Sequence, residues 1–134
     1  MVKTTTLTVN TNASSEFVNI TKDIEALLEK SPVENGHVIL FTPHTTAAVT
    51  INENADPDVQ SDMVKGLNKI SPNLKAFDHM EGNSDAHIKS TIVGASEHVL
   101  IKDGRLVLGT WQGIYFAEFD GPRTRKLHVQ IQGN

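Results

Sequence analysis

Apolar and β-branched runs recur along the chain, and one of them alternates with polar residues at the period of a β-strand. This run lies near the C-terminus, where polar residues separate Leu127, Val129 and Ile131. A period of two places these three side chains on one face of a strand, so we expect that face to be buried and the other to be wet. Apolar or β-branched runs predict strands at residues 4–9, 16–20, 37–42, 47–51, 99–102, 105–108, 114–119 and 126–132.

Two segments show the spacing of an amphipathic helix instead. The first begins at Thr21, the expected N-cap, and ends before Pro32. Its apolar stripe is formed by Ile24, Leu27 and Leu28. The second covers residues 56–70, with Asp56 at the N-cap and Pro57 at the first helical position.

The remaining segments complete the predicted fold. Asp103-Gly104 is a two-residue turn signal that should join its flanking strands as a hairpin. Residues 86–93 fit a strand or a short helix equally well. Many strands with two principal helices predict an α+β fold, a largely antiparallel sheet or β-sandwich. A length of 134 residues is typical of one domain, which we expect to span residues 1–134.

Composition excludes several classes of protein. The chain has no cysteine, which rules out disulfides, thiolate zinc sites and cysteine nucleophiles. Its net charge is −4 and its only basic cluster is Arg123, Arg125 and Lys126, so we expect no nucleic acid partner. Residues 1–10 lack the apolar core of a signal peptide, and no apolar run approaches the length of a membrane span. We therefore expect a cytoplasmic protein with no membrane partner.

Residues 77–89, FDHMEGNSDAHIK, are the stretch richest in groups able to do chemistry. A core strand or helix is not built this way, because few of these groups can be buried without a hydrogen-bond partner. We expect a loop that passes into a short helix or an extended segment from about Asp85. The candidate side chains of this stretch are His79, Glu81, Asn83, Ser84, Asp85 and His87.

The two histidines of this stretch favour a metal site. With a third histidine from elsewhere they would form a three-histidine site with an open position, as in catalytic zinc proteins. The alternative is a polar surface loop without a ligand. His79-Met80-Glu81 is similar to the H-x-E of nucleoside deaminases, but those enzymes also need a cysteine pair that this chain lacks.

Two polar segments flank the strand predicted at residues 47–51. The segment TPHTT, residues 42–46, offers His44 and Thr45 at a sheet edge, where binding sites are often placed. A loop histidine hydrogen-bonded to the backbone is the alternative for His44. Glu53 follows the strand and is a candidate general base, or a residue that orients a ligand histidine.

The C-terminal third adds a candidate anion-binding group. Arg123 follows a Gly-Pro turn and could bind phosphate or carboxylate, with a solvent-facing arginine as the alternative. For Arg125 we favour the solvent-facing alternative. Trp111 lies between two glycines and is explained by packing at a sheet bend or as the wall of a pocket. Asp62 should be solvated on the second helix.

Three long blocks of the sequence resemble a known family. FTPHTTAAVTINENADPDV, HMEGNSDAHIKSTIVGAS and GRLVLGTWQGIYFAEFDGPRTRKLHVQI are similar, in this order, to signature blocks of the YjbQ-like family, also labelled secondary thiamine-phosphate synthase. The resemblance covers nearly the whole chain from Glu16 onward. It implies a compact α+β fold with a β-sandwich core, assembled as a homotrimer with sites near the subunit interfaces.

The resemblance also implies a divalent metal, zinc, held by histidines. The matching positions are His44, His79 and His87, and the polar residues expected around the pocket are Glu53, Asn83 and Arg123. Thr45 and Ser84 are further candidates for binding an anionic substrate. The implied reaction joins a pyrimidine methyl diphosphate to a thiazole phosphate and expels pyrophosphate.

Three hypotheses for function follow. The first is a metal-dependent enzyme that acts on small phosphorylated substrates, with thiamine phosphate formation as the candidate activity. The second is a zinc-dependent hydrolase of a small ester or phosphoester, in which a metal-bound water attacks. The third is a non-catalytic module that binds a small anion.

Overall fold

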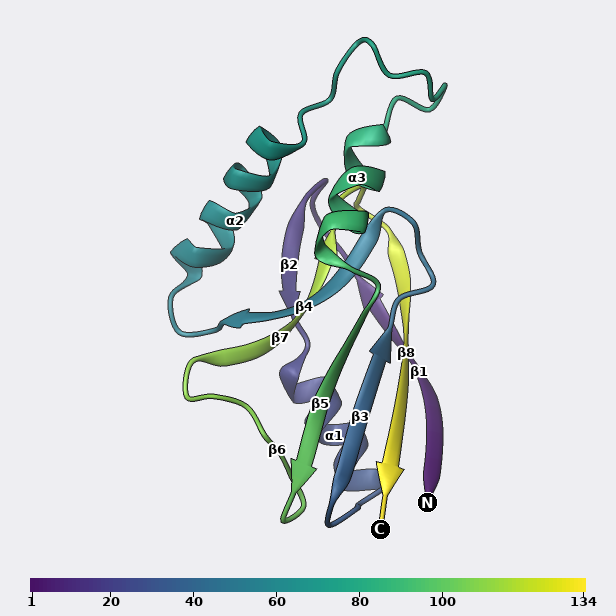
Figure 1. The fold of residues 1–134 in the computed structure, drawn as a ribbon, viewed down its shortest axis with the longest axis vertical. Helices are drawn as coiled ribbons and strands as arrows, with labels where there is room; N and C mark the ends of the chain where they lie inside the picture. Colours follow the sequence, from purple (N-terminus) through teal and green to yellow (C-terminus); the bar gives the residue numbers. More distant parts are fainter.

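The computed structural model describes residues 1–134, in which two antiparallel sheets and three helices form an elongated molecule (Figure 1). The elements in chain order are β1 (Val2–Asn10), β2 (Glu16–Asn19), α1 (Thr21–Lys30), β3 (Gly36–Phe41), β4 (Ala47–Glu53), α2 (Pro57–Ile70), α3 (Ser84–Val93), β5 (Ser96–Lys102), β6 (Arg105–Leu106), β7 (Gln112–Glu118) and β8 (Thr124–Gly133). None of the helices is long and apolar enough to cross a membrane.

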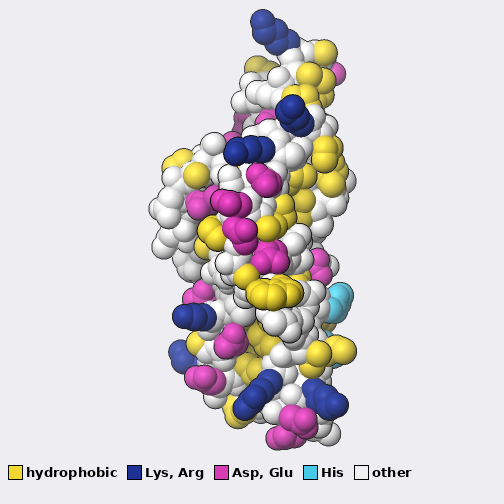
Figure 2. Space-filling view, turned by 90° about the vertical axis from the view of Figure 1, so that its left-hand side faces the viewer, with side chains coloured by type: hydrophobic (Ala, Val, Ile, Leu, Met, Phe, Trp, Pro, Cys, Tyr) yellow, Lys and Arg dark blue, Asp and Glu magenta, His cyan; other side chains and the backbone are white.

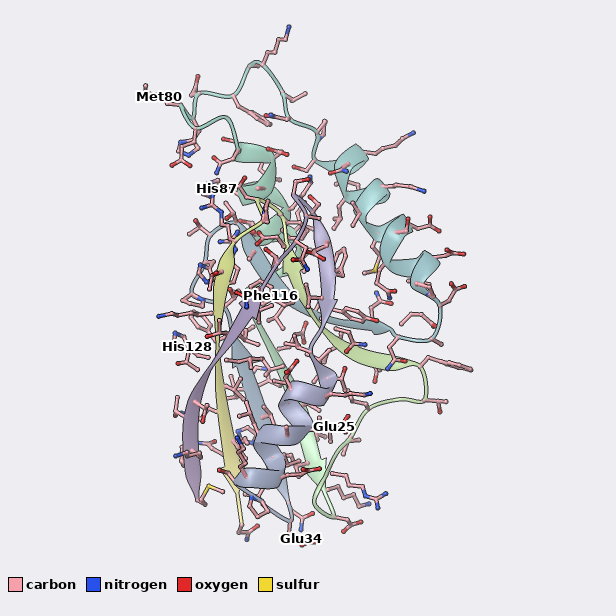
Figure 3. All side chains as sticks on the ribbon, turned by 180° about the vertical axis from the view of Figure 1, so that it is seen from behind. Glu25, Glu34, Met80, His87, Phe116 and His128 are labelled. Atoms are coloured by element: carbon pink, nitrogen blue, oxygen red, sulfur yellow. The ribbon has the colours of Figure 1, made fainter.

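The larger sheet has the strand order β1-β8-β3-β5-β6, and the smaller one has the order β2-β7-β4. Every strand pair is antiparallel, which confirms the predicted α+β class. The main core lies between the two sheets and α1, with the fully buried Phe116 near its centre (Figure 3). The alternating residues Leu127, Val129 and Ile131 are at most 2% exposed, so the period of two gives the buried face of β8.

The predicted strands and the two principal helices are present, with ends that lie within three residues of the predictions. The strand expected at residues 105–108 is shorter, since β6 has only two residues. The ambiguous segment at residues 86–93 belongs to a third helix, α3. Periodicity could not identify it because its buried residues are Ala86, Lys89 and Ser90, of which two are polar.

The expected N-cap at Asp56 is confirmed, whereas the one at Thr21 is wrong. The Asp56 carboxylate accepts a hydrogen bond from the N–H of Asp58 at 2.9 Å. Thr21 is itself the first residue of α1. Its hydroxyl donates to Asn19 Oδ1 at 2.7 Å and accepts from the N–H of Ile114 at 2.8 Å, so it ties α1 to β7.

Candidate functional site

A polar cavity of about 400 Å³ lies where the β3–β4 loop, the start of α3 and the β7–β8 turn meet. Apart from one proline, every side chain that lines it is polar or charged. The lining residues are Pro43, His44, Thr45, Thr46, His79, Glu81, Asn83, His87, Asp120, Arg123 and Arg125. The fold therefore gathers in this polar cavity the three histidines expected to bind metal, although His44 is 35 residues from the nearest of the others.

The three histidines have different surroundings. The rings of His79 and His87 meet edge to face, with their centroids 5.4 Å apart. His87 lies in the first turn of α3, near the upper ends of the strands (Figure 3). His44 Nε2 accepts a hydrogen bond from the N–H of Lys126 at 2.9 Å, so the neutral ring carries its proton on Nδ1. Burial, and then the charge of Arg125, lower the pKa of His44. This favours the neutral imidazole, the form that binds metals.

Asn83 lines the polar cavity and has a side-chain acceptor without a partner. Its Nδ2 donates to Asp120 Oδ2 at 2.8 Å and to Glu81 Oε2 at 3.4 Å, which fixes the orientation of the amide. Its Oδ1 is buried and has no hydrogen-bond partner. An unsatisfied buried acceptor costs about 1–3 kcal/mol, so a donor from water or from a ligand would stabilise this site.

Arg123 is bound to the turn that precedes it and is half exposed. Its Nε donates to the Asp120 carbonyl oxygen at 2.7 Å, and its Nη2 donates to Asp120 Oδ2 at 3.0 Å. Asp120 thus receives hydrogen bonds from both Arg123 and Asn83. The predicted anion-binding arginine lines the polar cavity, but two of its three nitrogens are already engaged.

Arg125 is buried, so the expectation that it faces solvent is wrong. Its side chain is 5% exposed and that of Glu118 is 0% exposed, and the two form an ion pair. Arg125 Nη2 also donates to Thr46 Oγ1 at 2.8 Å. The sequence carried a signal for this burial. Alternate residues of a strand lie on one face, which places residue 125 on the inward face of β8 with Leu127 and Val129.

Glu118 is charged at neutral pH. Burial by itself would raise the pKa of its carboxyl group. Hydrogen bonds from Arg125, from the N–H of Asp120 and from the Thr11 hydroxyl outweigh burial and lower that pKa. The Glu118–Arg125 pair is therefore a true cation–anion pair beneath the polar cavity.

The donor set of the polar cavity fits a divalent metal, although no group of three or more His, Asp or Glu side chains is placed to hold one in this arrangement. Three imidazoles line the cavity, beside the unpartnered Oδ1 of Asn83. Among the lining residues, the carboxylates of Glu81 and Asp120 equal the guanidinium groups of Arg123 and Arg125 in number. With neutral imidazoles the lining carries no net charge, so the fit to a metal rests on the imidazole nitrogens.

Two predicted site residues do not line the polar cavity. Glu53 is the last residue of β4, whereas the cavity lies before the first. The Glu53 carboxylate accepts hydrogen bonds from the N–H groups of Ala55 and Asp56, each at 3.3 Å, and so supports the entry into α2. Its carbonyl oxygen accepts from the Tyr115 hydroxyl at 2.8 Å, and burial raises the pKa of Tyr115. Ser84 begins α3 outside the cavity lining.

Three other residues bear on the sequence predictions. Asp62 is exposed on α2, as expected. The side chain of Trp111 is 62% exposed, so packing at a sheet bend does not explain it, and it lines none of the three main cavities. Asp120 was not a candidate, yet it organises Asn83 and Arg123 around the polar cavity. A carboxylate next to a Gly-Pro turn carries no sequence signal that separates this role from turn formation.

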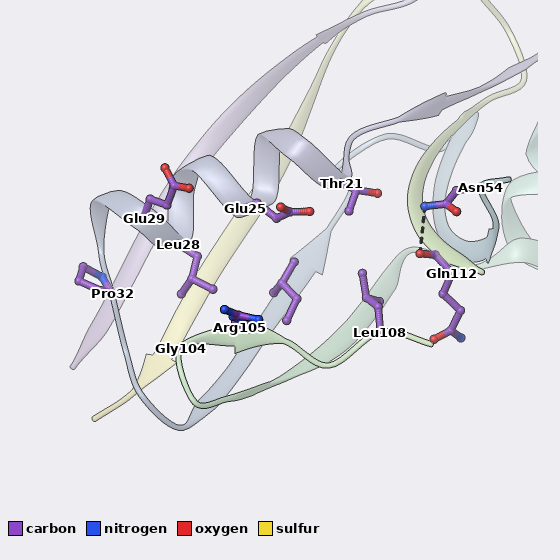
Figure 4. Close-up of a pocket in the computed structure, with 11 residues that line it drawn as sticks. Thr21, Glu25, Leu28, Glu29, Pro32, Asn54, Gly104, Arg105, Leu108 and Gln112 are labelled. Atoms are coloured by element: carbon purple, nitrogen blue, oxygen red, sulfur yellow. Dashed lines mark hydrogen bonds between the residues drawn. The ribbon is translucent and has the colours of Figure 1, made fainter. Parts of the chain in front are cut away.

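Two further cavities contain none of the predicted site residues. One, of about 710 Å³, lies between α1 and the segment that follows β5, with Glu25 and Arg105 among its lining residues (Figure 4). The other, of about 360 Å³, is mostly apolar and lies between α2 and α3.

On the side of the molecule that carries α2, hydrophobic side chains lie exposed among acidic ones (Figure 2), and no residue of α2 is buried.

Comparison with known proteins gives the family. Residues 5–134 match the model of the family described as UPF0047 protein YjbQ-like. The chain is 50% identical to the UPF0047 protein YugU of Bacillus subtilis over 96% of this chain and 98% of that protein. A crystal structure of a yjbq/upf0047 family protein from Clostridium acetobutylicum has a TM-score of 0.93 at 47% identity, covering 96% of this chain and 99% of that one.

A YbjQ-like protein of unknown function from Sulfolobus solfataricus has a similar structure at lower identity. Its crystal structure has a TM-score of 0.95 at 33% identity, covering 100% of this chain and 99% of that one. The family model matches residues 5–134, a range that includes the β3–β4 loop, the start of α3 and the β7–β8 turn. The chain therefore belongs to the UPF0047 family of YjbQ-like proteins.

Proposed function

We propose that this protein is a metal-dependent enzyme that acts on small phosphorylated molecules, with the polar cavity as its active site. The observation that carries the proposal is the convergence of His44, His79 and His87 on one cavity that also holds two arginines. Imidazoles serve a divalent metal and guanidinium groups serve phosphate, so one cavity offers the donors for both.

The metal we propose is zinc, with His44, His79 and His87 as its ligands. Neutral imidazoles suit zinc. When bound, zinc would supply charge neutralisation for a phosphoryl group. His44 could bind zinc through either ring nitrogen. Nε2 would first have to give up its hydrogen bond from the N–H of Lys126. Nδ1 would instead have to lose its proton.

The candidate reaction is the formation of thiamine phosphate with release of pyrophosphate. In this reaction the chain must hold two substrates and neutralise the charge on the leaving diphosphate. Arg123 and Arg125 line the cavity with Thr45 and would bind substrate oxygens. Asn83 Oδ1, buried and unpartnered, would accept a hydrogen bond from a donor on the substrate, which fixes its orientation.

We also propose assembly as a homotrimer. Several large hydrophobic side chains are exposed on one chain, among them Ile70 at 68%, Leu100 at 65% and Trp111 at 62%. Their cover by neighbouring copies would explain this exposure. Within one chain Glu53 and Ser84 lie outside the polar cavity. They would take part in the chemistry only if a trimer placed them beside the polar cavity of a neighbouring copy. Light scattering during size-exclusion chromatography measures the mass of the assembly, which should be that of three chains.

One observation favours hydrolysis as the second candidate. His79, Glu81 and Arg123 are exposed, so within one chain the polar cavity is open to water. Condensation of two substrates benefits from a site that excludes water, whereas hydrolysis needs it. In a hydrolase the same three histidines would hold zinc and a phosphoester or ester would be cleaved.

The first experiment is metal analysis of the untagged protein, wild type beside His79→Ala and His87→Ala. The control variant is His98→Ala, which changes an exposed histidine on β5 away from the cavity. We expect near-stoichiometric zinc in the wild type and in His98→Ala, and its loss from the two cavity variants. A wild type without metal after incubation with zinc contradicts the proposal and leaves the non-catalytic anion-binding module.

The second experiment identifies the reaction. The zinc-loaded protein is incubated with the pyrimidine diphosphate and the thiazole phosphate, together and singly, and products are separated by chromatography. Thiamine phosphate and pyrophosphate from the pair alone support the synthase. Orthophosphate or pyrophosphate released from either substrate alone supports the hydrolase.

A further inference from the structure

Arg125 has one free nitrogen, and it belongs to the polar cavity. Its Nε donates to Glu118 Oε1 at 2.8 Å, and its Nη2 donates to Glu118 Oε2 at 2.5 Å and to Thr46 Oγ1 at 2.8 Å. Nη1 makes no hydrogen bond, but it is not fully buried. Since Arg125 is 4% exposed and lines the cavity, the opening through which Nη1 is reached is the polar cavity.

The surrounding network holds this guanidinium group in place. Glu118 accepts from the Thr11 hydroxyl at 2.7 Å and from the N–H of Asp120 at 3.0 Å, in addition to Arg125. Each member of the network is fixed by another, so the Arg125 side chain is ordered before a ligand arrives. A preordered donor loses little conformational entropy on binding.

The β3–β4 loop adds further free donors beside Arg125. The N–H groups of Thr45 and Thr46 make no hydrogen bond to any part of the chain, and both residues line the polar cavity. The adjacent N–H of His44 reaches only Thr42 Oγ1, at 3.4 Å. Successive free N–H groups next to an arginine nitrogen are the usual elements of an oxyanion site.

We propose that Arg125, together with the N–H groups of Thr45 and Thr46, binds a phosphoryl group of the substrate, and that Arg123 is not the principal anion-binding residue. The inference rests on the proposed function in that a phosphorylated substrate enters the polar cavity. Arg123 is half exposed and engages Asp120 through two nitrogens, so water screens its charge.

The geometry favours a phosphoryl group over a carboxylate. A carboxylate prefers two parallel N–H groups of one guanidinium edge. On Arg125 the Nε–Nη2 edge is occupied by Glu118, and Nη2 also serves Thr46. A tetrahedral phosphoryl group with three oxygens can instead take single donors from three separate groups.

Calorimetric titration with inorganic pyrophosphate tests the proposal, using protein treated with a chelator so that metal does not contribute. Arg125→Lys keeps the charge but offers a single nitrogen, which Glu118 takes. We expect this variant to bind pyrophosphate at least about tenfold more weakly than the wild type, the loss expected for a charged hydrogen bond. The matched variant Arg123→Lys should change the affinity less than about threefold. Equal affinity of Arg125→Lys and wild type overturns the proposal, as does an equal loss in both variants.

Nuclear magnetic resonance of the wild type makes the test independent of variant folding. The Nε–H of Arg125 is buried against Glu118 and should give a slowly exchanging signal. We expect pyrophosphate to shift this signal more than that of Arg123 Nε–H. A wild type in which pyrophosphate shifts neither signal, or only that of Arg123, overturns the proposal even if Arg125→Lys fails to fold.

The outcomes separate this inference from the proposed function. Pyrophosphate binding that depends on Arg125, in a protein that neither retains zinc nor turns over phosphorylated substrates, supports the anion site and contradicts the enzyme. Zinc binding and turnover, with pyrophosphate affinity unchanged in Arg125→Lys, supports the enzyme and contradicts the anion site.

Discussion

Arg125 on β8 and Glu118 on β7 form a two-point ion pair in the interior, with Nε–Oε1 at 2.8 Å and Nη2–Oε2 at 2.5 Å. The two strands belong to different sheets, so the pair links the sheets at the base of the polar cavity. Both side chains are at most 5% exposed. The pair therefore stabilises the part of the cavity wall that the β3–β4 loop and the β7–β8 turn form.

Glu118→Ala should strongly destabilise the fold. The substitution leaves the Arg125 guanidinium buried without its counter-ion, which costs about 3–5 kcal/mol of unfolding free energy. Urea denaturation followed by circular dichroism measures the change. Glu25→Ala, at an exposed position of α1, serves as the control and should change the unfolding free energy by less than about 0.5 kcal/mol. A loss in Glu118→Ala no larger than in the control would contradict the role of the pair.

The Glu118 carboxyl group should make stability depend on acidic pH. Its pKa is lowered in the folded protein from the ordinary value of 4.5. The unfolded chain therefore binds the proton more readily, and the stabilisation is complete above pH 4.5 and is lost as the pH falls through the lowered pKa. We expect urea midpoints to fall below pH 4.5 more steeply for the wild type than for Glu118→Gln. Parallel curves for the two proteins would assign the acid sensitivity to other groups.

Asp56→Ala should weaken the start of α2. The Asp56 carboxylate accepts from the N–H of Asp58, and loss of such a cap costs about 1 kcal/mol. Thermal and urea denaturation measure this loss. Asp62→Ala, on the exposed side of the same helix, removes a like charge without a cap and should have a smaller effect. An equal effect of the two substitutions would show that net charge, and not capping, is responsible.

Gly36→Ala should disrupt the pairing of β3 with β8. A Cβ atom at position 36 would lie 1.8 Å from the carbonyl oxygen of Gln132, which is backbone and cannot move aside without a shift of β8. We expect a lower melting temperature and faster amide hydrogen exchange in Val38 and neighbouring residues of β3. Gly66→Ala is the matched control, because a Cβ there meets nothing within 4 Å and alanine favours the helix. A Gly36→Ala protein as stable as the wild type would contradict this close approach.

Zinc should stabilise the folded protein through the cavity histidines. A ligand that binds only the folded state raises its melting temperature by mass action. We expect added zinc to raise the melting temperature of the wild type and of His98→Ala, and to leave that of His87→Ala unchanged. Differential scanning calorimetry with and without a chelator gives the comparison. An equal shift in all three proteins would place the bound zinc elsewhere.

Local sequence patterns specify the individual strands, helices and turns. The period of two identified the buried face of β8, Asp56-Pro57 marked the start of α2, and Asp103-Gly104 marked the β5–β6 hairpin. These signals are readable because each depends on a few neighbouring residues and on backbone sterics. They also supported the α+β class, since the pattern of strands and helices limits the possible layers.

Which polar residues share a site depends on contacts between distant segments of the chain. His44 and Glu53 are close in sequence, yet the length of β4, which ends at Glu53, separates them by roughly 20 Å. His44 instead shares the polar cavity with His79 and His87, because the turn after β3 and the start of α3 meet beside β8. The alternation along β8 places Arg125 on the buried face, but a charged side chain is stable there only because Glu118 of the other sheet neutralises it. Such pairings involve distant segments, so no local pattern specifies them.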